Sequence, residues 1–124
     1  MTNTLGVDWG EKRIGLAVSR GNFAEPFGFV SSFEELFKVI KQEDIEKVVL
    51  GLPEGKHEKR VRELGARIEK ELEIPVVLRS EVLTSRQALR KIIEAGKPKK
   101  SRAALDAVSA ALLLQEHLDE YPIV

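Results

Sequence analysis

The 124-residue sequence contains no cysteine, so disulfide bonds and thiolate metal sites are excluded and we expect a cytoplasmic location. It has no excess of charge of either sign, because 20 basic residues balance 20 acidic ones. Total charge therefore does not indicate a nucleic-acid partner, and any such partner must be bound by a local basic patch. No apolar run approaches the length of a membrane span, and the N-terminus shows no signal-peptide pattern, so we expect no membrane association.

What remains is an ordinary globular composition, with 43% hydrophobic and 32% charged residues. A chain of this length is large enough to form a hydrophobic core of its own. No internal repeat, low-complexity run or linker is present. We therefore expect one domain that covers residues 1–124.

Apolar spacing predicts the order of the elements. Short apolar runs bounded by turn residues predict strands at 5–8, 14–18, 27–30, 47–52 and 75–78. The runs at 47–52 and 75–78 are continuous, which is typical of strands buried on both faces. Apolar residues at helical spacing, with capping boxes that begin at Ser32 and Thr84, predict helices at 33–42, 57–72, 84–95 and 101–119.

This order predicts an α/β fold. Three adjacent strands at the start favour antiparallel pairing, and the later alternation of strands and helices favours parallel pairing. The expected architecture is a mixed five-stranded sheet with helices on both faces. The last helix is rich in alanine and leucine, so we expect it to be largely buried.

Three carboxylates stand in unusual places. Asp8 ends an apolar run, where a buried carboxylate is unfavourable unless a metal or partner compensates it; the alternative is a turn Asp that bonds its own backbone. Glu81 follows a strand, where the carboxyl ends of parallel strands form sites; the alternative is an exposed loop residue. Asp106 interrupts the most apolar helix, and its neighbours are small enough to let that helix lie close to the sheet: Ala103, Ala107 and Ala110.

Four motifs carry a family resemblance: DWGEKRIGLAVS at 8–19, VVLGLP at 48–53, SEVLTS at 80–85 and DAVSAALLL at 106–114. In this order and spacing they resemble the YqgF family, also called RuvX, of pre-16S rRNA nucleases and Holliday-junction-resolvase-like proteins. The resemblance covers nearly the whole chain. It implies a ribonuclease H-like fold and an acidic site formed by Asp8, Glu81 and Asp106, which would serve as catalytic residues and as metal ligands.

The sequence departs from the family pattern in two places. Ser80 and Val82 stand where the family usually has an Asp and an Arg, and the loop after Pro53 is shortened to Glu54-Gly55-Lys56. The three acids are retained. The substrate contacts that the missing Arg and the longer loop would make are left open.

Three carboxylates suit phosphodiester hydrolysis with divalent ions. Two such ions about 4 Å apart activate a water and stabilise the leaving alkoxide. Mg²⁺ or Mn²⁺ prefers oxygen ligands, so we expect one of them, as two ions when substrate is bound. Zinc is not favoured, because the chain has no cysteine and no clustered histidine pair. His57 and His117 are expected at the surface, and His117 lies near the C-terminal end of a helix, where a histidine is favourable.

Basic residues lie close in sequence to each acid. A single group of basic residues is usually just solvated surface. Because such a group lies close in sequence to each of the three acids, we favour a basic rim around the acids that binds nucleic-acid phosphates. Trp9, next to Asp8, either stacks on an unpaired base or packs in the core. The expected phosphate contacts are Lys12, Arg13, Arg86, Lys99, Lys100 and Arg102, with Arg90 and Lys97 beside them.

These features predict a metal-dependent nuclease, a hydrolase that acts on ester bonds, with a precursor rRNA end as its substrate. RNA is favoured over branched DNA because the outward helix faces are charged and offer no apolar stripe for a stable dimer, so we expect a monomer or weak dimer. A Holliday junction resolvase is the first alternative. A non-catalytic RNA-binding module is the second, favoured by Ser80 and Val82. An ATPase of the actin and sugar-kinase superfamily is disfavoured, because such enzymes close two domains of this kind around ATP.

Overall fold

A computed structural model describes residues 2–53, 55–80 and 102–122. Its strands are β1 (Thr4–Trp9), β2 (Ile14–Ser19), β3 (Ala24–Val30), β4 (Lys47–Leu52) and β5 (Val76–Ser80). Its helices are α1 (Phe33–Gln42), α2 (Glu58–Leu72) and α4 (Arg102–Glu120). The predicted helix at 84–95 lies outside the described residues. No helix in the described part of the chain is long and apolar enough to cross a membrane.

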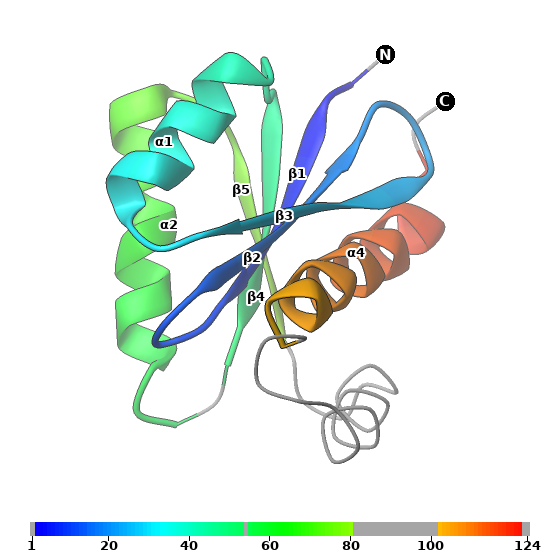
Figure 1. Cartoon of the computed structure of the whole chain (residues 1–124). Helices are drawn as coiled ribbons and strands as arrows, with labels where there is room; N and C mark the ends of the chain where they lie inside the picture. Colours follow the sequence, from blue (N-terminus) through cyan, green and yellow to red (C-terminus); the bar gives the residue numbers. More distant parts are fainter. Residues whose placement is uncertain (1, 54, 81–101, 123–124) are drawn as a thin grey trace.

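The strands form the predicted five-stranded mixed sheet in the order β3-β2-β1-β4-β5. The pairs β1–β2 and β2–β3 are antiparallel, whereas β1–β4 and β4–β5 are parallel. Helices α1 and α2 cover one face of the sheet and α4 covers the other (Figure 1). The predicted fold class is therefore confirmed. Strand β3 is longer than expected and includes Pro26, which an edge strand tolerates because one side of it has no ladder to complete.

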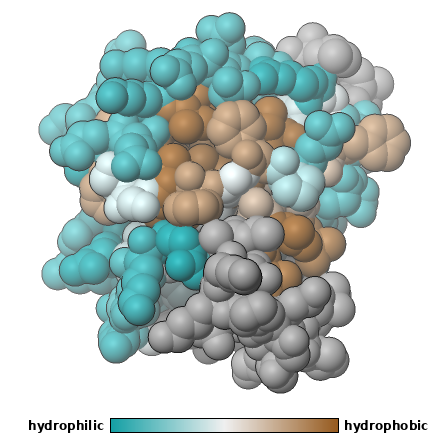
Figure 2. Space-filling model, viewed as in Figure 1, coloured by the Kyte–Doolittle hydropathy of each residue, from teal (hydrophilic) through white to brown (hydrophobic). Residues whose placement is uncertain are grey.

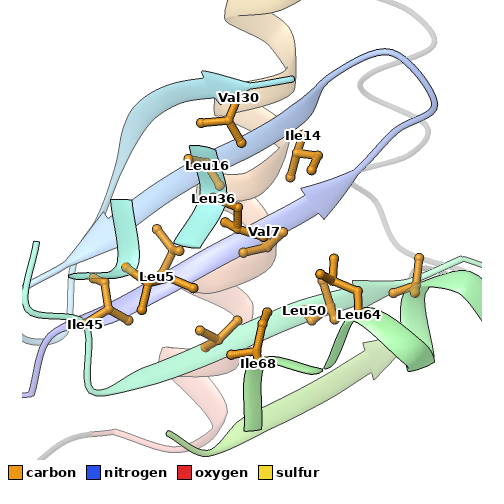
Figure 3. Packing of buried hydrophobic residues seen from close by; sticks show 13 residues of the cluster. Leu5, Val7, Ile14, Leu16, Val30, Leu36, Ile45, Leu50, Leu64 and Ile68 are labelled. Atoms are coloured by element: carbon orange, nitrogen blue, oxygen red, sulfur yellow. The ribbon is translucent and has the colours of Figure 1, made fainter. Parts of the chain in front are cut away.

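The main core lies between the sheet and the helices α1 and α2. Alternate residues of each inner strand point to this side, among them Leu5 and Val7 of β1, and meet Leu36 of α1 and Leu64 of α2 (Figure 3). Ser32 caps α1 as predicted, because its Oγ accepts a hydrogen bond from the backbone N–H of Glu35 at 3.2 Å. These contacts fix α1 and α2 on one face and leave the other face to α4.

Helix α4 packs unusually close to the sheet. A Cβ added to Gly6 of β1 would stand 2.8 Å from Cβ of Leu114, and a Cβ added to Gly15 of β2 would stand 2.1 Å from the backbone oxygen of Asp106. Only glycine leaves room for a helix backbone at these two positions. The helix side of this contact consists largely of buried small residues and leucines, as predicted: Ala107, Ala110, Ala111, Leu113, Leu114 and Leu118.

Two expectations about burial are wrong. Strand β5 is an edge strand, so it is only half-buried and Leu78 is 38% exposed. His117 is buried against the sheet rather than at the surface, and it lies 3.1 Å from Nζ of Lys47. Burial and the nearby charges of Lys47 and Arg79 lower the pKa of His117, so the ring is neutral at pH 7.

The β3 edge exposes apolar side chains that the sequence did not single out. Phe23 is 82% exposed, and Phe27 and Phe29 are about half exposed. Figure 2 shows apolar surface across the middle of the face on which β3 runs in Figure 1. A short period-2 pattern cannot tell whether the outward residues of a strand are covered, which is why the sequence did not reveal this surface.

The close packing of α4 predicts that Gly15→Ala destabilises the protein. The new methyl group meets backbone rather than a movable side chain, so the helix must shift, at a cost of about 1–3 kcal/mol or more. Chemical denaturation monitored by circular dichroism measures this loss. The matched control is Gly65→Ala in α2, where an added Cβ makes only 3.4 Å contacts with side chains and helix propensity improves. Equal effects of the two substitutions would contradict the tight contact of α4.

Candidate active site

Strand β1 directs Asp8 toward α4. Its neighbour Val7 lies in the core under α1 and α2, and Gly6 faces Leu114 of α4. Because successive side chains of a strand point to opposite faces, Asp8 lies on the same face as Gly6. The Asp8 residue is only 7% exposed, at the carboxyl end of its strand. Of the two readings that the sequence left open for Asp8, the structure agrees with the buried carboxylate.

Helix α4 brings Asp106 next to Asp8. Asp8 is the cross-strand partner of Gly15, and a Cβ on Gly15 would lie 3.0 Å from Cβ of Asp106. Cross-strand partners have Cβ positions about 5 Å apart, so Asp106 lies over the residue directly opposite Asp8. Asp106 is only 6% exposed. Two buried carboxylates that are 98 positions apart in the sequence thus occupy neighbouring positions in space.

Arg13 joins this pair from the turn between β1 and β2. Its Nε donates a hydrogen bond to Oδ2 of Asp106 at 2.8 Å, and the Arg13 side chain is 31% exposed whereas that of Asp106 is 9% exposed. The guanidinium supplies positive charge to a carboxylate that has little contact with water, and such compensation is what a buried carboxylate needs. Sequence analysis placed Arg13 among the phosphate contacts and did not predict this ion pair.

The other predicted site residues are placed only in part. Lys12 is exposed and lies on the opposite side of the β1–β2 turn. Arg102 begins α4, but its side chain lies outside the described part of the structure, as do the whole residues Glu81, Arg86, Lys99 and Lys100. Their roles stay predictions.

Glu81 directly follows β5 in the sequence, and β5 ends at the same edge of the sheet as the Asp8 end of β1. The register pairs Val7 with Leu50 and Leu50 with Leu78, so β5 ends at Ser80 beside the carboxyl ends of β1 and β4. Within residues 2–53, 55–80 and 102–122, no group of three potential metal ligands is present. The donor set that the structure does place, two adjacent buried carboxylates balanced by a guanidinium, is chemically suited to a hard divalent cation.

Two glycines of this site were missed by sequence analysis. Gly6 and Gly15 permit the close approach that positions Asp106, yet each was treated as an ordinary member of an apolar run. The signal was present, because a glycine in the interior of a strand often marks a point where another backbone approaches closely.

Comparison with known proteins identifies the family. The sequence profile of the RuvX family, described as Holliday junction resolvase, matches residues 2–120. The chain belongs to the RuvX family. It is 32% identical over 136 aligned positions to a protein of Syntrophus aciditrophicus, covering 93% of this chain and 87% of that protein. It is 36% identical over 144 positions to one of Bifidobacterium longum subsp. infantis, covering 93% and 95%. Both relatives are named "Putative pre-16S rRNA nuclease".

These RuvX alignments are longer than the chain itself, so the relatives carry insertions that this member lacks. That agrees with the shortened loop inferred after Pro53.

Solved structures confirm the ribonuclease H-like fold. Thermus thermophilus RuvC superposes with a TM-score of 0.60 at 12% identity, covering 96% of each chain. Fowlpox virus resolvase, solved with Holliday junction DNA, superposes with a TM-score of 0.58 at 13% identity, covering 94% of this chain and 99% of the resolvase. At such identities the comparison establishes the shared fold of this RuvX protein and no more.

The ion pair of Arg13 with Asp106 predicts that Arg13→Gln lowers the free energy of unfolding by about 1–3 kcal/mol, because a buried carboxylate loses its charged donor. Urea denaturation measures the change. The control is Arg20→Gln, which breaks the more exposed pair with Glu43 and should cost less than about 1 kcal/mol. An Arg13 variant that is no less stable than the Arg20 variant would show that Asp106 does not depend on this contact.

Proposed function

We propose that this RuvX protein is a divalent-metal-dependent nuclease that hydrolyses phosphodiester bonds in RNA, at an end of precursor 16S rRNA. The observation that carries the proposal is the pairing of Asp8 and Asp106, two buried carboxylates that the fold holds at neighbouring positions beside a strand end. Two buried carboxylates at neighbouring positions repel each other, and the ion pair of Arg13 with Asp106 offsets part of that repulsion. A divalent cation between the carboxylates would neutralise both of them.

Asp8 and Asp106 would hold the ion, with Glu81 as the predicted third ligand. A bound Mg²⁺ or Mn²⁺ supplies Lewis-acid stabilisation of the phosphate and a more acidic water. In hydrolysis, the water oxygen forms a bond to phosphorus, the bond to the leaving oxygen breaks, and the water loses a proton while the leaving oxygen gains one. A carboxylate oxygen of Asp8 or Asp106 that does not bind the ion would accept the proton of the water. Arg13 would donate to a phosphate oxygen from the guanidinium nitrogens other than Nε, which bonds Asp106.

The preference for RNA rests on the relatives named above, which are 32–36% identical over at least 93% of this chain. A protein that acts on precursor rRNA works in the cytoplasm, which agrees with the cysteine-free composition. We assign the basic residues that lie near the acids in the sequence, namely Lys12, Arg13, Arg86, Lys99, Lys100 and Arg102, to contacts with the phosphates of the strand being cut.

A second candidate function is the resolution of branched DNA. It is favoured by the exposed phenylalanines of β3, because symmetric cleavage of a junction needs two active sites in a stable dimer and these side chains offer apolar surface for one. Sizing at micromolar concentration, with cleavage of a four-way junction and of a precursor rRNA fragment side by side, distinguishes the two. A stable dimer that nicks the junction symmetrically and leaves the RNA intact would overturn the preference for RNA.

The nuclease proposal predicts that Asp8→Asn abolishes Mg²⁺-dependent cleavage and leaves the fold intact. Loss of a carboxylate that organises the metal site removes several kcal/mol of transition-state stabilisation, which corresponds to a loss of about a hundredfold or more. The variant should be as stable as the wild type without metal, or slightly more so, because one of two neighbouring negative charges is removed.

The control for this variant is Asp119→Asn, which changes an exposed carboxylate on α4, the helix that carries Asp106. It should cleave like the wild type. Unchanged cleavage by Asp8→Asn would refute the assignment of the site. Nucleic-acid binding with no cleavage by the wild type under any divalent ion would favour a non-catalytic binding module.

A further inference from the structure

The hairpin that carries Asp8 has a second surface. Trp9 follows Asp8 on β1 and points to the opposite face of the sheet, where it packs partly against the core under α1 and α2. There it borders an open cavity of about 410 Å³, whose walls also include Lys12 of the turn, Phe33 at the start of α1 and Arg60 of α2. The prediction that Trp9 packs in the core thus holds for part of the ring, and stacking on an unpaired base stays a prediction.

The cavity combines an aromatic wall with positive charge. The guanidinium of Arg60 lies over the Trp9 ring, with Cζ 5.9 Å from the ring centre, so a base that stacks on this face takes the place of the guanidinium. Within the described part of the chain Arg60 forms no ion pair. Lys12 adds a second exposed cation. The N-terminal turn of α1, capped by Ser32, borders the same space, and its own acids Glu34 and Glu35 offset the positive end of the helix dipole there.

Among the described residues that line this cavity, Glu11 is the one acid, and it already has partners. Oε1 of Glu11 lies 2.7 Å from Nε2 of His57 and 3.7 Å from Nζ of Lys56. The His57 ring in turn lies against Trp9, with the ring centres 4.9 Å apart and the planes at 51°. His57 therefore packs against the tryptophan and Glu11 pairs with His57, while Arg60, over the Trp9 ring, and Lys12 are the cations that would meet an anion.

We propose that this cavity, defined by Trp9, Lys12, Phe33 and Arg60, binds one nucleotide of a single-stranded nucleic acid, with the base stacked on Trp9 and a phosphate held by Arg60 and Lys12. A flat aromatic wall beside cations is the combination that binds unpaired nucleotides. The cavity also falls within the range of sizes, about 300–1,000 Å³, that is usual for small-ligand sites. Double-stranded nucleic acid does not fit this chemistry, because its bases are not free to stack.

The position of this nucleotide subsite gives it a role in the proposed nuclease reaction, and that role rests on the proposed function. The tip of the β1–β2 hairpin separates the two surfaces: Arg13 contacts Asp106 on one side, and Lys12 borders the nucleotide subsite on the other. A strand that crosses the tip would have its scissile phosphate at the acids and a neighbouring nucleotide on Trp9. The nucleotide subsite would then set the register of the strand and select unpaired ends.

Trp9 is the single tryptophan of the chain, so its fluorescence reports directly on the nucleotide subsite. The experiment titrates the full-length protein in EDTA, where no cleavage occurs, with a 5′-phosphorylated RNA tetranucleotide of adenosines. Excitation is at a wavelength that tyrosine does not absorb. We expect saturable quenching, and we expect ribose 5-phosphate, which lacks a base, to produce none. Binding of a dye-labelled tetranucleotide is followed in parallel by anisotropy.

Variants test the individual contacts. Trp9→Leu should weaken anisotropy-detected binding about tenfold, since stacking on one aromatic ring contributes on the order of 1–3 kcal/mol per base, whereas Trp9→Phe should retain most of it. Arg60→Ala should weaken binding several-fold. The matched control is Arg62→Ala, two residues further along α2, because Arg62 is exposed and paired with Glu58. It should bind like the wild type.

The outcomes test the proposed nucleotide subsite and the proposed nuclease activity independently. Saturating anisotropy without quenching, or equal weakening by Arg60→Ala and Arg62→Ala, would overturn the nucleotide subsite even if the protein cleaves RNA. Quenching that Asp8→Asn retains while its cleavage is lost supports both proposals. Quenching in a wild-type protein that cleaves no nucleic acid would support the nucleotide subsite and refute the nuclease.

Discussion

The close packing of α4 on β1 and β2 is the constraint on which the site depends. Gly6 and Gly15 have no side chains, so the helix backbone rests directly on the two strands. This contact fixes the height and the rotation of α4, and it thereby sets where Asp106 points. Without it, the helix would still bury its alanines and leucines, but its carboxylate would stand further from Asp8. The packing of α4 and the position of the Asp106 carboxylate therefore depend on the same two residues, Gly6 and Gly15.

The β1–β2 hairpin contributes residues to two surfaces, because successive side chains of a strand point to opposite faces of the sheet. Asp8 faces α4 and Trp9 faces α1 and α2, and the turn repeats this division with Arg13 on one side and Lys12 on the other. The opposite directions of Asp8 and Trp9 follow from the period of a β-strand. The same period explains why Asp8 is buried under α4 while Trp9 borders the open cavity on the other face.

Local patterns predicted the elements well, and contacts between distant elements were beyond them. Apolar runs and the cap at Ser32 located the sheet and the helices, and an Asp inside an apolar helix correctly marked Asp106 as unusual. The ion pair of Arg13 with Asp106 joins residues 93 positions apart, and no local pattern encodes it. For the same reason, the edge position of β5 and the burial of His117 were mispredicted: both depend on which strands and helices become neighbours.

The central claim is that the fold brings carboxylates of β1 and α4 together to bind a metal. A crystal structure of the wild-type protein soaked with Mn²⁺, with the ion located by its anomalous scattering, tests this claim most directly. We expect manganese bound by oxygens of both Asp8 and Asp106, with Glu81 as a further ligand. Manganese bound elsewhere, or an Asp8–Asp106 pair that stays without manganese at saturating concentration, would contradict the account.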